Sequence, residues 1–140
     1  MTEQRASTPS TETVLSLQQL YAFQVQAIDA GAGADWASTF TDDGIFESPT
    51  YGSAIAGCVD LEEFVYEFHR KAGSSHLRHW FSTFSFDQVA EDRVMSYFYG
   101  MILETAPGST PEIARSFVVV DEVHLVGTEW RVASRKVTID

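Results

Sequence analysis

The apolar pattern of the chain changes its period at the stretch His76-Leu77-Arg78-His79-Trp80-Phe81-Ser82-Thr83-Phe84. Upstream, apolar residues recur every three or four positions, whereas from here on they alternate, which is typical of β-strands. The segments that follow are rich in aromatic and β-branched residues and are separated by short turn signals. We predict four consecutive antiparallel strands, over residues 77–89, 93–104, 113–126 and 129–139.

Both faces of the first of these strands are largely apolar. Because side chains alternate along a strand, its two faces can be assigned from the sequence. One face is expected to carry His79, Phe81, Thr83 and Ser85, and the other Trp80, Phe84 and Phe86. We therefore expect helices to cover one side of the sheet and a partner or second layer to cover the other.

Helical spacing dominates the first half of the chain. Apolar residues at three- and four-residue intervals predict a helix over residues 13–30, which Gly31 and Gly33 end. Asp60 and Glu63 have the spacing of a capping box, which predicts a second amphipathic helix over residues 60–72.

Between these two helices, Asp35 is expected to cap a shorter helix that runs to Phe40. Thr41-Asp42-Asp43-Gly44 is a turn signal, so we expect a turn there and a short strand over residues 45–48. Residues 1–12 are predicted to be a disordered tail, and residues 13–140 a single α+β domain with the helices on one face of a curved sheet.

Composition and charge limit the possible functions. The chain has 140 residues, of which 44% are hydrophobic, and its ten phenylalanines are more than a small core needs, so some could line a cavity. Its net charge is -11, and its nine basic residues are scattered, which argues against binding to nucleic acid. No apolar run is long enough to span a membrane, and no secretory signal begins the sequence. We expect a soluble cytoplasmic protein.

Cysteine and histidine spacing gives no support to metal or disulfide chemistry. Cys58 is the single cysteine, and we interpret it as a small buried apolar residue rather than a nucleophile. His76 and His79 would lie on opposite faces of a strand, and His69 and His124 add no ligand spacing. No glycine-rich phosphate loop is present. We expect no metal and no cofactor.

Three side chains are candidates for proton transfer. His79 lies among aromatic residues, where an imidazole can exchange protons near neutral pH, although a core histidine bonded to a carbonyl is equally compatible. Asp29 lies near the end of the first helix, where the helix dipole disfavours an acid; it could orient the His79 ring or simply be an exposed carboxylate. Glu104 follows the alternation of Ile102 and could be a second proton carrier or a solvated strand-end residue.

Several short motifs occur in a characteristic order. They are the first helix ending in Asp29, Ala34-Asp35-Trp36 with Phe40-Thr41-Asp42-Asp43-Gly44-Ile45-Phe46, Arg78-His79-Trp80 leading to Glu91-Asp92-Arg93-Val94, and Glu129-Trp130-Arg131-Val132. With these motifs the chain resembles the nuclear transport factor 2-like superfamily, and within it the SnoaL-like polyketide cyclase and scytalone dehydratase group. The resemblance implies a cone-shaped α+β barrel with a deep apolar pocket and a homodimer formed through the outer sheet face.

The resemblance also implies roles for individual residues. Asp29 and His79 fall where scytalone dehydratase has an aspartate that orients a histidine, and Glu104 takes the place of a second histidine. Two tyrosines of that enzyme are replaced by Ile28 and Ser48, with Tyr51 close enough to substitute. Tyr97 and Tyr99 are further possible hydroxyl donors.

A histidine assisted by a carboxylate suits proton removal next to a carbonyl. We therefore predict a cofactor-independent dehydratase, cyclase or isomerase acting on an aromatic, polyketide-like substrate, with His79 as base and acid, Asp29 as its partner and Glu104 as a second acid. The expected substrate-binding residues are Tyr51, Phe46, Phe81, Phe98, Ile102, Phe117 and Val119. The alternative is a non-catalytic subunit or carrier, because the chain also resembles the small subunits of ring-hydroxylating dioxygenases.

Overall fold

A computed structural model describes residues 7–140, in which six strands form one sheet in the order β2-β1-β6-β5-β4-β3. Neighbouring strands are antiparallel except β1 and β6, which are parallel. The strands are β1 (Phe40–Glu47), β2 (Ile55–Ala56), β3 (His76–Ala90), β4 (Arg93–Thr105), β5 (Glu112–Val126) and β6 (Glu129–Ile139). The four long strands predicted from alternation are confirmed, with ends that differ by one residue at most.

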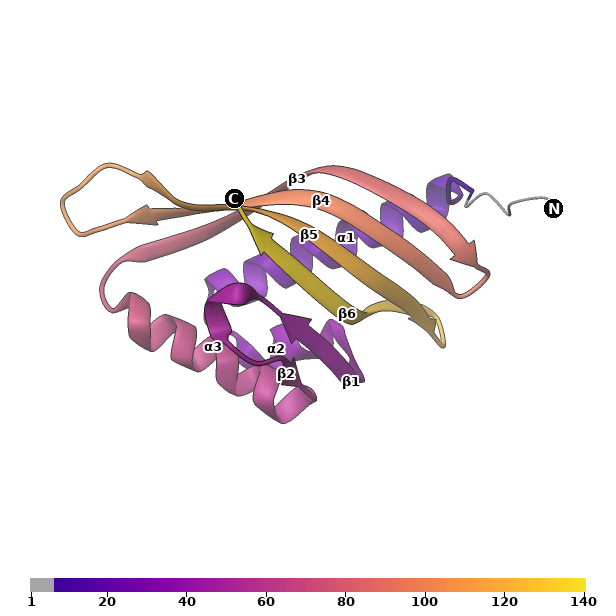
Figure 1. The fold of residues 1–140 in the computed structure, drawn as a ribbon, viewed down its shortest axis with the longest axis horizontal. Coiled ribbons are helices and arrows are strands. Elements are labelled where there is room, and N and C mark those ends of the chain that lie inside the picture. The colour runs from indigo at the N-terminus through magenta and orange to yellow at the C-terminus, as the bar shows by residue number, and fades with distance from the viewer. Residues whose placement is uncertain (1–6) are drawn as a thin grey trace.

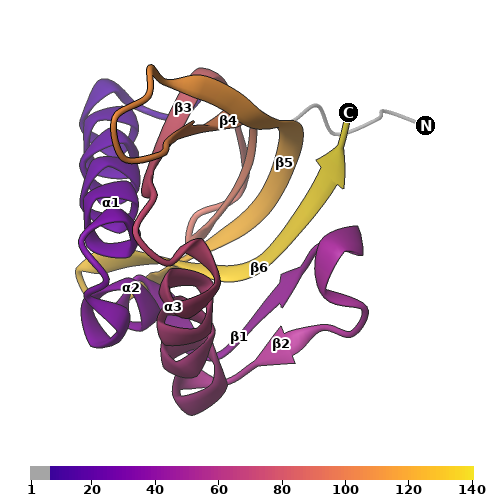
Figure 2. The ribbon, with the colours of Figure 1, turned by 90° about the vertical axis from the view of Figure 1, so that its left-hand side faces the viewer.

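Three helices lie on the concave side of this sheet. They are α1 (Thr11–Asp29), α2 (Gly33–Ser38) and α3 (Cys58–Ala72), and a short 3-10 helix, η1 (Pro49–Tyr51), joins β1 to β2. Figure 1 shows α1 running along the sheet, and Figure 2 shows the strands curving over the space that the helices close. The predicted α+β class and its cone-like shape are confirmed.

The beginning of α1 differs from the expectation. The helix starts at Thr11, and the Ser10 hydroxyl caps it by accepting a hydrogen bond from the Thr13 backbone amide. Ser7 exchanges two backbone hydrogen bonds with Gln88 of β3. The described part of the expected tail therefore pairs with the sheet, while residues 1–6 lie outside the described residues.

Both helix caps that were expected from the sequence, at Asp35 and at Asp60, are wrong. Helix α2 begins after Ala32 and α3 begins after Gly57, and neither helix has a side-chain cap. Asp35 and Asp60 both lie in the first turn of their helices. There a carboxylate still interacts favourably with the positive end of the helix dipole, which explains why the sequence signal was close but displaced.

The expected turn at residues 41–44 is also wrong, because this segment belongs to β1. The strand starts at Phe40, and its register against β6 shifts between Phe40 and Ile45, so a bulge absorbs the polar residues. A Cβ atom at Gly44 would lie 2.8 Å from the Cβ of Phe40. Glycine is needed where the bulged backbone folds back this closely.

A second irregularity reverses the alternation in the middle of β3. Thr83 has a positive φ of 60°, and the register against β4 shifts between Ser82 and Ser85. Phe84 therefore points to the inner face, where its ring centroid lies 4.8 Å from that of Phe98. The prediction that Phe84 and Phe86 share a face with Trp80 is wrong, because one bulge residue shifts every later side chain to the opposite face.

The main core fills the space between the helices and the inner sheet face. Its fully buried large side chains include Tyr21 of α1, Trp36 of α2, Leu61 of α3 and Phe98 of β4. The helices thus close one side of an aromatic interior.

No helix within residues 7–140 is long and apolar enough to cross a membrane.

Candidate active site

The structure brings Asp29 and His79 together at the edge of the interior. Asp29 is the last residue of α1, and His79 is the fourth residue of β3. The carboxylate Oδ1 lies 2.7 Å from Nδ1 of the imidazole and also accepts the His79 backbone N–H at 3.1 Å. The side chains are only 19% and 10% exposed, respectively. Two contacts to one residue fix both the backbone and the ring of His79.

A second histidine holds the end of the helix that carries Asp29. The His69 Nε2–H of α3 donates a hydrogen bond to the Ile28 carbonyl, with a distance of 2.6 Å. This carbonyl lies in the last turn of α1, where it also accepts the Gly31 backbone N–H at 3.1 Å. The bond offsets the unfavourable placement of an acid at a helix C-terminus and fixes the backbone next to Asp29.

His79 opens onto a cavity between the sheet and the helices. The inner cavity has a volume of about 60 Å³, and it leads into a wider vestibule of about 600 Å³. Residues shared by the two spaces include Tyr51, Phe68, Ile102 and Arg115. Together the two spaces have the size of an ordinary small-molecule site.

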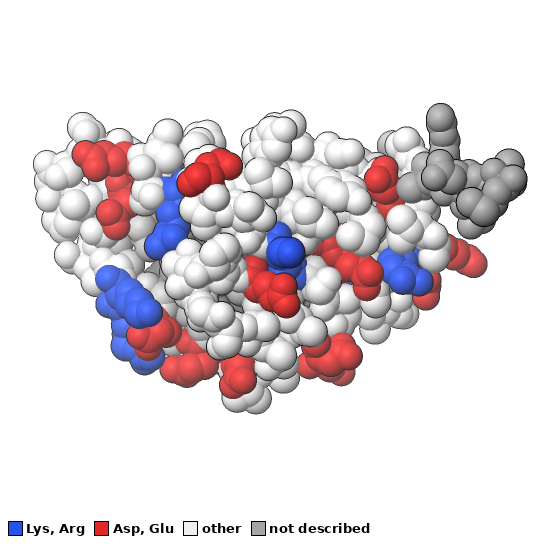
Figure 3. Space-filling model, in the orientation of Figure 1, with Lys and Arg blue, Asp and Glu red and all other residues white. Residues whose placement is uncertain are grey.

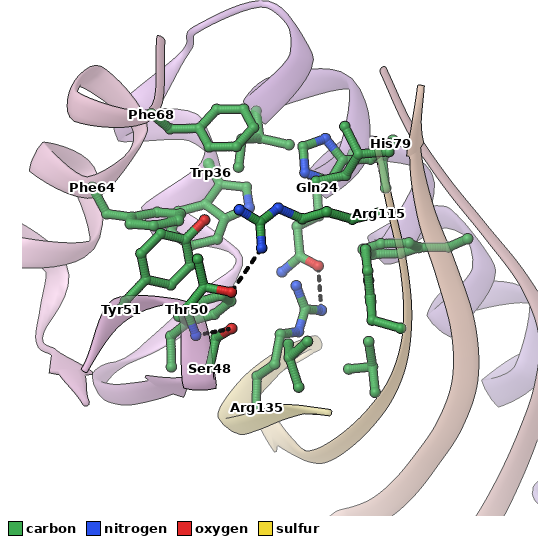
Figure 4. Close-up of a pocket in the computed structure, with 18 of the residues that line it drawn as sticks. Gln24, Trp36, Ser48, Thr50, Tyr51, Phe64, Phe68, His79, Arg115 and Arg135 are labelled. Carbon is green, nitrogen blue, oxygen red and sulfur yellow. Dashed lines mark hydrogen bonds between the residues drawn. The ribbon is translucent and has the colours of Figure 1, made fainter. Parts of the chain in front are cut away.

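The inner wall is mainly aromatic and aliphatic (Figure 4). Of the residues expected to bind substrate, six line it: Phe46, Tyr51, Phe81, Ile102, Phe117 and Val119. Phe98 does not, because it lies in the core behind Phe81, with ring centroids 4.8 Å apart. The sequence missed several aromatic lining residues from the helices, namely Trp36, Phe64 and Phe68.

The remaining candidate proton carriers lie elsewhere. Glu104 is exposed and lines the vestibule rather than the inner cavity that contains His79. Tyr97 and Tyr99 are 39% and 56% exposed, which places their hydroxyls outside the cavity. Of the three tyrosines considered, Tyr51 alone lines the inner cavity.

A buried ion pair forms the floor of the cavity. The Arg135 guanidinium of β6 donates to the Asp121 carboxylate of β5 through Nε at 2.9 Å and through Nη2 at 2.8 Å. Nη2 also donates to the Gln24 side chain, and the Tyr21 hydroxyl donates to Asp121 at 2.8 Å. Burial lowers the pKa of Arg135, but the Asp121 carboxylate and its hydrogen bonds outweigh this and leave it raised. Arg135 therefore stays charged.

Aromatic rings surround this cation. The Arg135 Cζ atom lies 5.5 Å from the ring centroid of Phe81 and 5.8 Å from that of Phe98, within reach of cation–π attraction. Sequence reasoning missed Arg135, although a signal was available. Asp121 alternates with Val119 and Val123, which predicts a buried acid, and a buried acid requires a buried cation nearby.

Arg115 of β5 stands where the inner cavity meets the vestibule. Its Nη1 donates a hydrogen bond to the Thr50 hydroxyl of η1 at 2.8 Å, across the opening (Figure 4). Burial raises the pKa of the nearby Tyr51 hydroxyl, and the Arg115 charge lowers it by less. Tyr51 therefore carries its proton at neutral pH and can donate it in a hydrogen bond.

One glycine allows an aromatic side chain of the cavity wall to lie close to the sheet backbone. Gly100 of β4 lies between Phe81 and Phe117 in the sheet, as their cross-strand neighbour on either side. A Cβ atom at position 100 would overlap the Phe117 ring. The ring packs flat against the backbone only because no side chain is present there.

The described residues offer no metal site, since residues 7–140 contain no group of three His, Cys, Asp or Glu side chains that could hold an ion. His124 pairs with Glu122 instead. Cys58 is exposed at the start of α3, so the expectation that it is buried is wrong. The polar side chains among the described residues that line the inner cavity are Gln24, Ser48, Thr50, Tyr51, His79, Arg115 and Arg135.

A curved α+β sheet closed by helices, with a carboxylate-bound histidine facing an apolar cavity, defines a small-molecule site of the nuclear transport factor 2-like class. Residues 9–136 match the family described as the SnoaL-like domain. The chain belongs to this family. The resemblance noted in the sequence is confirmed.

Solved structures give the same result. Aln2 from a Streptomyces species has the same fold, with 22% identity, a TM-score of 0.89 and coverage of 96% of this chain and 95% of that one. ActVI-ORFA from Streptomyces coelicolor is 28% identical, with a TM-score of 0.83 and coverage of 93% and 98%. A Catenulispora acidiphila protein in complex with S-DNPA is 26% identical, with a TM-score of 0.84 and coverage of 94% and 96%. No curated protein sequence matches the chain.

Proposed function

We propose that the protein is a cofactor-independent acid/base enzyme, a dehydratase or a cyclase or isomerase, acting on an aromatic, polyketide-like small molecule. The observation that carries this proposal is the hydrogen bond between His79 Nδ1 and Asp29 at the wall of an apolar cavity. Membership of the SnoaL-like family and the S-DNPA complex of a related protein support a small-molecule ligand.

The arrangement allows a simple mechanism. Asp29 accepts a hydrogen bond from the Nδ1–H group of His79. The lone pair of the imidazole therefore lies on Nε2, which can remove a proton next to a substrate carbonyl. The electron pair of the broken C–H bond then forms an enolate. The imidazolium returns its proton either to a departing hydroxyl, which gives water and a double bond, or to the alkoxide formed when the enolate attacks a second carbonyl. Asp29 stabilises the imidazolium between these two steps.

Tyr51 and Glu104 have secondary roles in this proposal. Tyr51 lines the inner cavity, and its pKa is raised by burial, so its hydroxyl is a suitable donor to a substrate oxygen. Glu104 lines the vestibule, where it serves as a second acid only for a part of the substrate that extends outward. His79 is therefore the group on which turnover depends most.

The test is to replace His79 and measure both turnover and folding. With candidate hydroxylated aromatic ketides as substrates, His79→Ala and His79→Gln should lower kcat/KM by about 10² to 10⁴ while the unfolding midpoint changes little. His124→Gln is the matched control, because His124 also pairs with a carboxylate but lies outside the cavity.

Unchanged turnover in His79→Gln would contradict the assignment. If the parent binds these compounds without converting them, and His79→Ala binds them equally well, the non-catalytic carrier is the correct function. Titration of the His79 ring by NMR, with and without ligand, reports directly whether the imidazole is accessible from the cavity.

We also propose that two copies associate through the outer sheet face. Trp80 and Tyr99 on this face are 52% and 56% exposed, which is unusual for such large side chains. Light scattering should give about twice the chain mass of 15.6 kDa. Tyr99→Glu should yield monomers, whereas Val59→Glu, at an exposed position of α3 away from the outer sheet face, should not. A parent protein that is monomeric by light scattering would disprove the dimer.

The cytoplasmic location stays a prediction.

A further inference from the structure

The charge inside the cavity is opposite to that of the whole protein. The chain has 20 acidic and nine basic residues, and acidic side chains are spread over the face shown in Figure 3. Among the described residues that line the inner cavity, however, two are arginines, Arg115 and Arg135, and none is Asp or Glu. A cavity of this composition favours a ligand with negative charge or with exposed oxygen acceptors.

The two arginines are not equivalent. Arg135 is 4% exposed and its charge is balanced by Asp121, which accepts two of its hydrogen bonds. None of the hydrogen bonds among the described residues uses Nη1 of Arg135, although the residue lines the cavity. A neutralised guanidinium with free N–H groups suits a neutral carbonyl oxygen, or the partial charge that develops on it.

Arg115 retains an unbalanced positive charge. Within residues 7–140 no carboxylate oxygen lies within 4 Å of its guanidinium nitrogens, and its hydrogen bond goes to the neutral Thr50 hydroxyl. The vestibule beyond it has mixed charge. It is lined by Glu67, Lys71, Glu104 and Asp140, of which Glu67 pairs with Arg70 and Asp140 accepts from Ser116. Of the described cations that line these two spaces, Arg115 and Lys71 have no carboxylate partner, and of these two only Arg115 also lines the inner cavity.

We propose that the ligand of this cavity is an aromatic monocarboxylate, with its carboxylate bound by Arg115 at the opening and a ring carbonyl directed inward to Arg135 Nη1. Tyr51 and Arg115 both line the inner cavity and the vestibule, and Figure 4 shows the Tyr51 hydroxyl on the same side of the cavity as the Arg115 guanidinium, so Tyr51 can also donate to the carboxylate. The aromatic rings fill the space beside Phe81, whose centroid lies 6.3 Å from that of His79 and 5.5 Å from Arg135 Cζ. This inference rests on the proposed function for the location of the site and adds the substrate class.

The test compares two probes that differ in charge and not in shape. Calorimetric titration with 2-naphthylacetate and 2-naphthylacetamide should give a Kd that is about tenfold lower for the acid, and the preference should shrink as salt is raised. Arg115→Gln should abolish the preference, whereas Arg115→Lys should keep part of it. Arg93→Gln is the matched control. It removes the same charge, but Arg93 is exposed at the start of β4 and does not line the cavity.

The outcomes separate this inference from the proposed reaction, because binding is measured without turnover. Equal affinity for the two probes, binding of neither probe, or an unchanged preference in Arg115→Gln would overturn the inference. If the acid is preferred and the preference disappears in Arg115→Gln, the inference stands even when no hydroxylated aromatic acid is converted. If the protein converts a neutral substrate and Arg115→Gln does not change that turnover, the proposed reaction stands and the inferred carboxylate ligand is overturned.

Discussion

Two carboxylates hold nitrogen groups at the wall of the same cavity, in different surroundings. Asp29 holds the His79 imidazole at the edge, where both side chains keep some contact with solvent. Asp121 holds the Arg135 guanidinium at the floor, where both side chains are fully enclosed. Only the first pair contains a histidine, the side chain that most often acts as general acid and base in enzymes.

The difference shows how one motif serves two purposes. A carboxylate beside a histidine near the surface fixes a tautomer and leaves one nitrogen free for chemistry. A carboxylate beside an arginine in the interior fixes a charge and a geometry, since the guanidinium does not deprotonate. We expect the Asp121 pair to govern folding and the Asp29 pair to govern turnover.

The largest expected effect comes from breaking the buried pair. Arg135→Met leaves the Asp121 carboxylate enclosed with Tyr21 as its remaining hydrogen-bond donor, so the free energy of unfolding should fall by about 3–5 kcal/mol. Urea titration measures this loss. The double variant Arg135→Met with Asp121→Asn removes the unpaired charge and should recover part of it, and a loss below about 1 kcal/mol in the single variant would contradict the comparison.

A smaller effect, confined to activity, is expected at the edge pair. Asp29→Asn allows the amide to donate to Nδ1, which places the proton of His79 on Nε2 and removes the base. The value of kcat should fall about 100-fold, equivalent to about 2.7 kcal/mol, with the unfolding free energy lowered by far less. Turnover assays on variants with matched unfolding curves check this. A variant that loses stability and keeps its activity would reverse the roles assigned to the two pairs.

The smallest effect concerns Tyr21, which donates to Asp121. Because this bond goes to a charged carboxylate, Tyr21→Phe should lower the free energy of unfolding by about 2 kcal/mol. Burial, and then the Asp121 charge, raise the pKa of Tyr21 well above its ordinary value of 10.0, so the folded protein keeps this proton where the unfolded chain releases it. Stability is therefore present below that value and is lost as pH rises above it. The loss on going from about pH 9 to pH 11 should be shallower in Tyr21→Phe than in the parent or in Tyr97→Phe, and parallel curves would argue against the buried bond.

The sequence was sufficient to predict the long strands, because each strand alternates strongly and the turns between them are short. It failed where one residue breaks a period. A bulge at Thr83 places Phe84 and Phe86 on the inner face. A second bulge, between Phe40 and Ile45, makes residues 41–44 part of β1 where a turn was expected. Bulges depend on cross-strand register, which alternation alone does not specify.

The candidate site was predicted in part. The resemblance and the unfavourable position of an acid at a helix end both indicated Asp29 and His79, which lie 50 residues apart and are in contact. The floor of the cavity, with Arg135 and its partner Asp121, was not predicted. Their pairing across β5 and β6 requires a register that only the folded sheet provides.

The ring of Phe117 lying against the bare backbone of Gly100 has a consequence for evolution and engineering. A single methyl group at position 100 would overlap that ring and force it to move, without altering any polar side chain. A substitution at position 100 is therefore expected to change the shape of the cavity wall while leaving its polar groups in place.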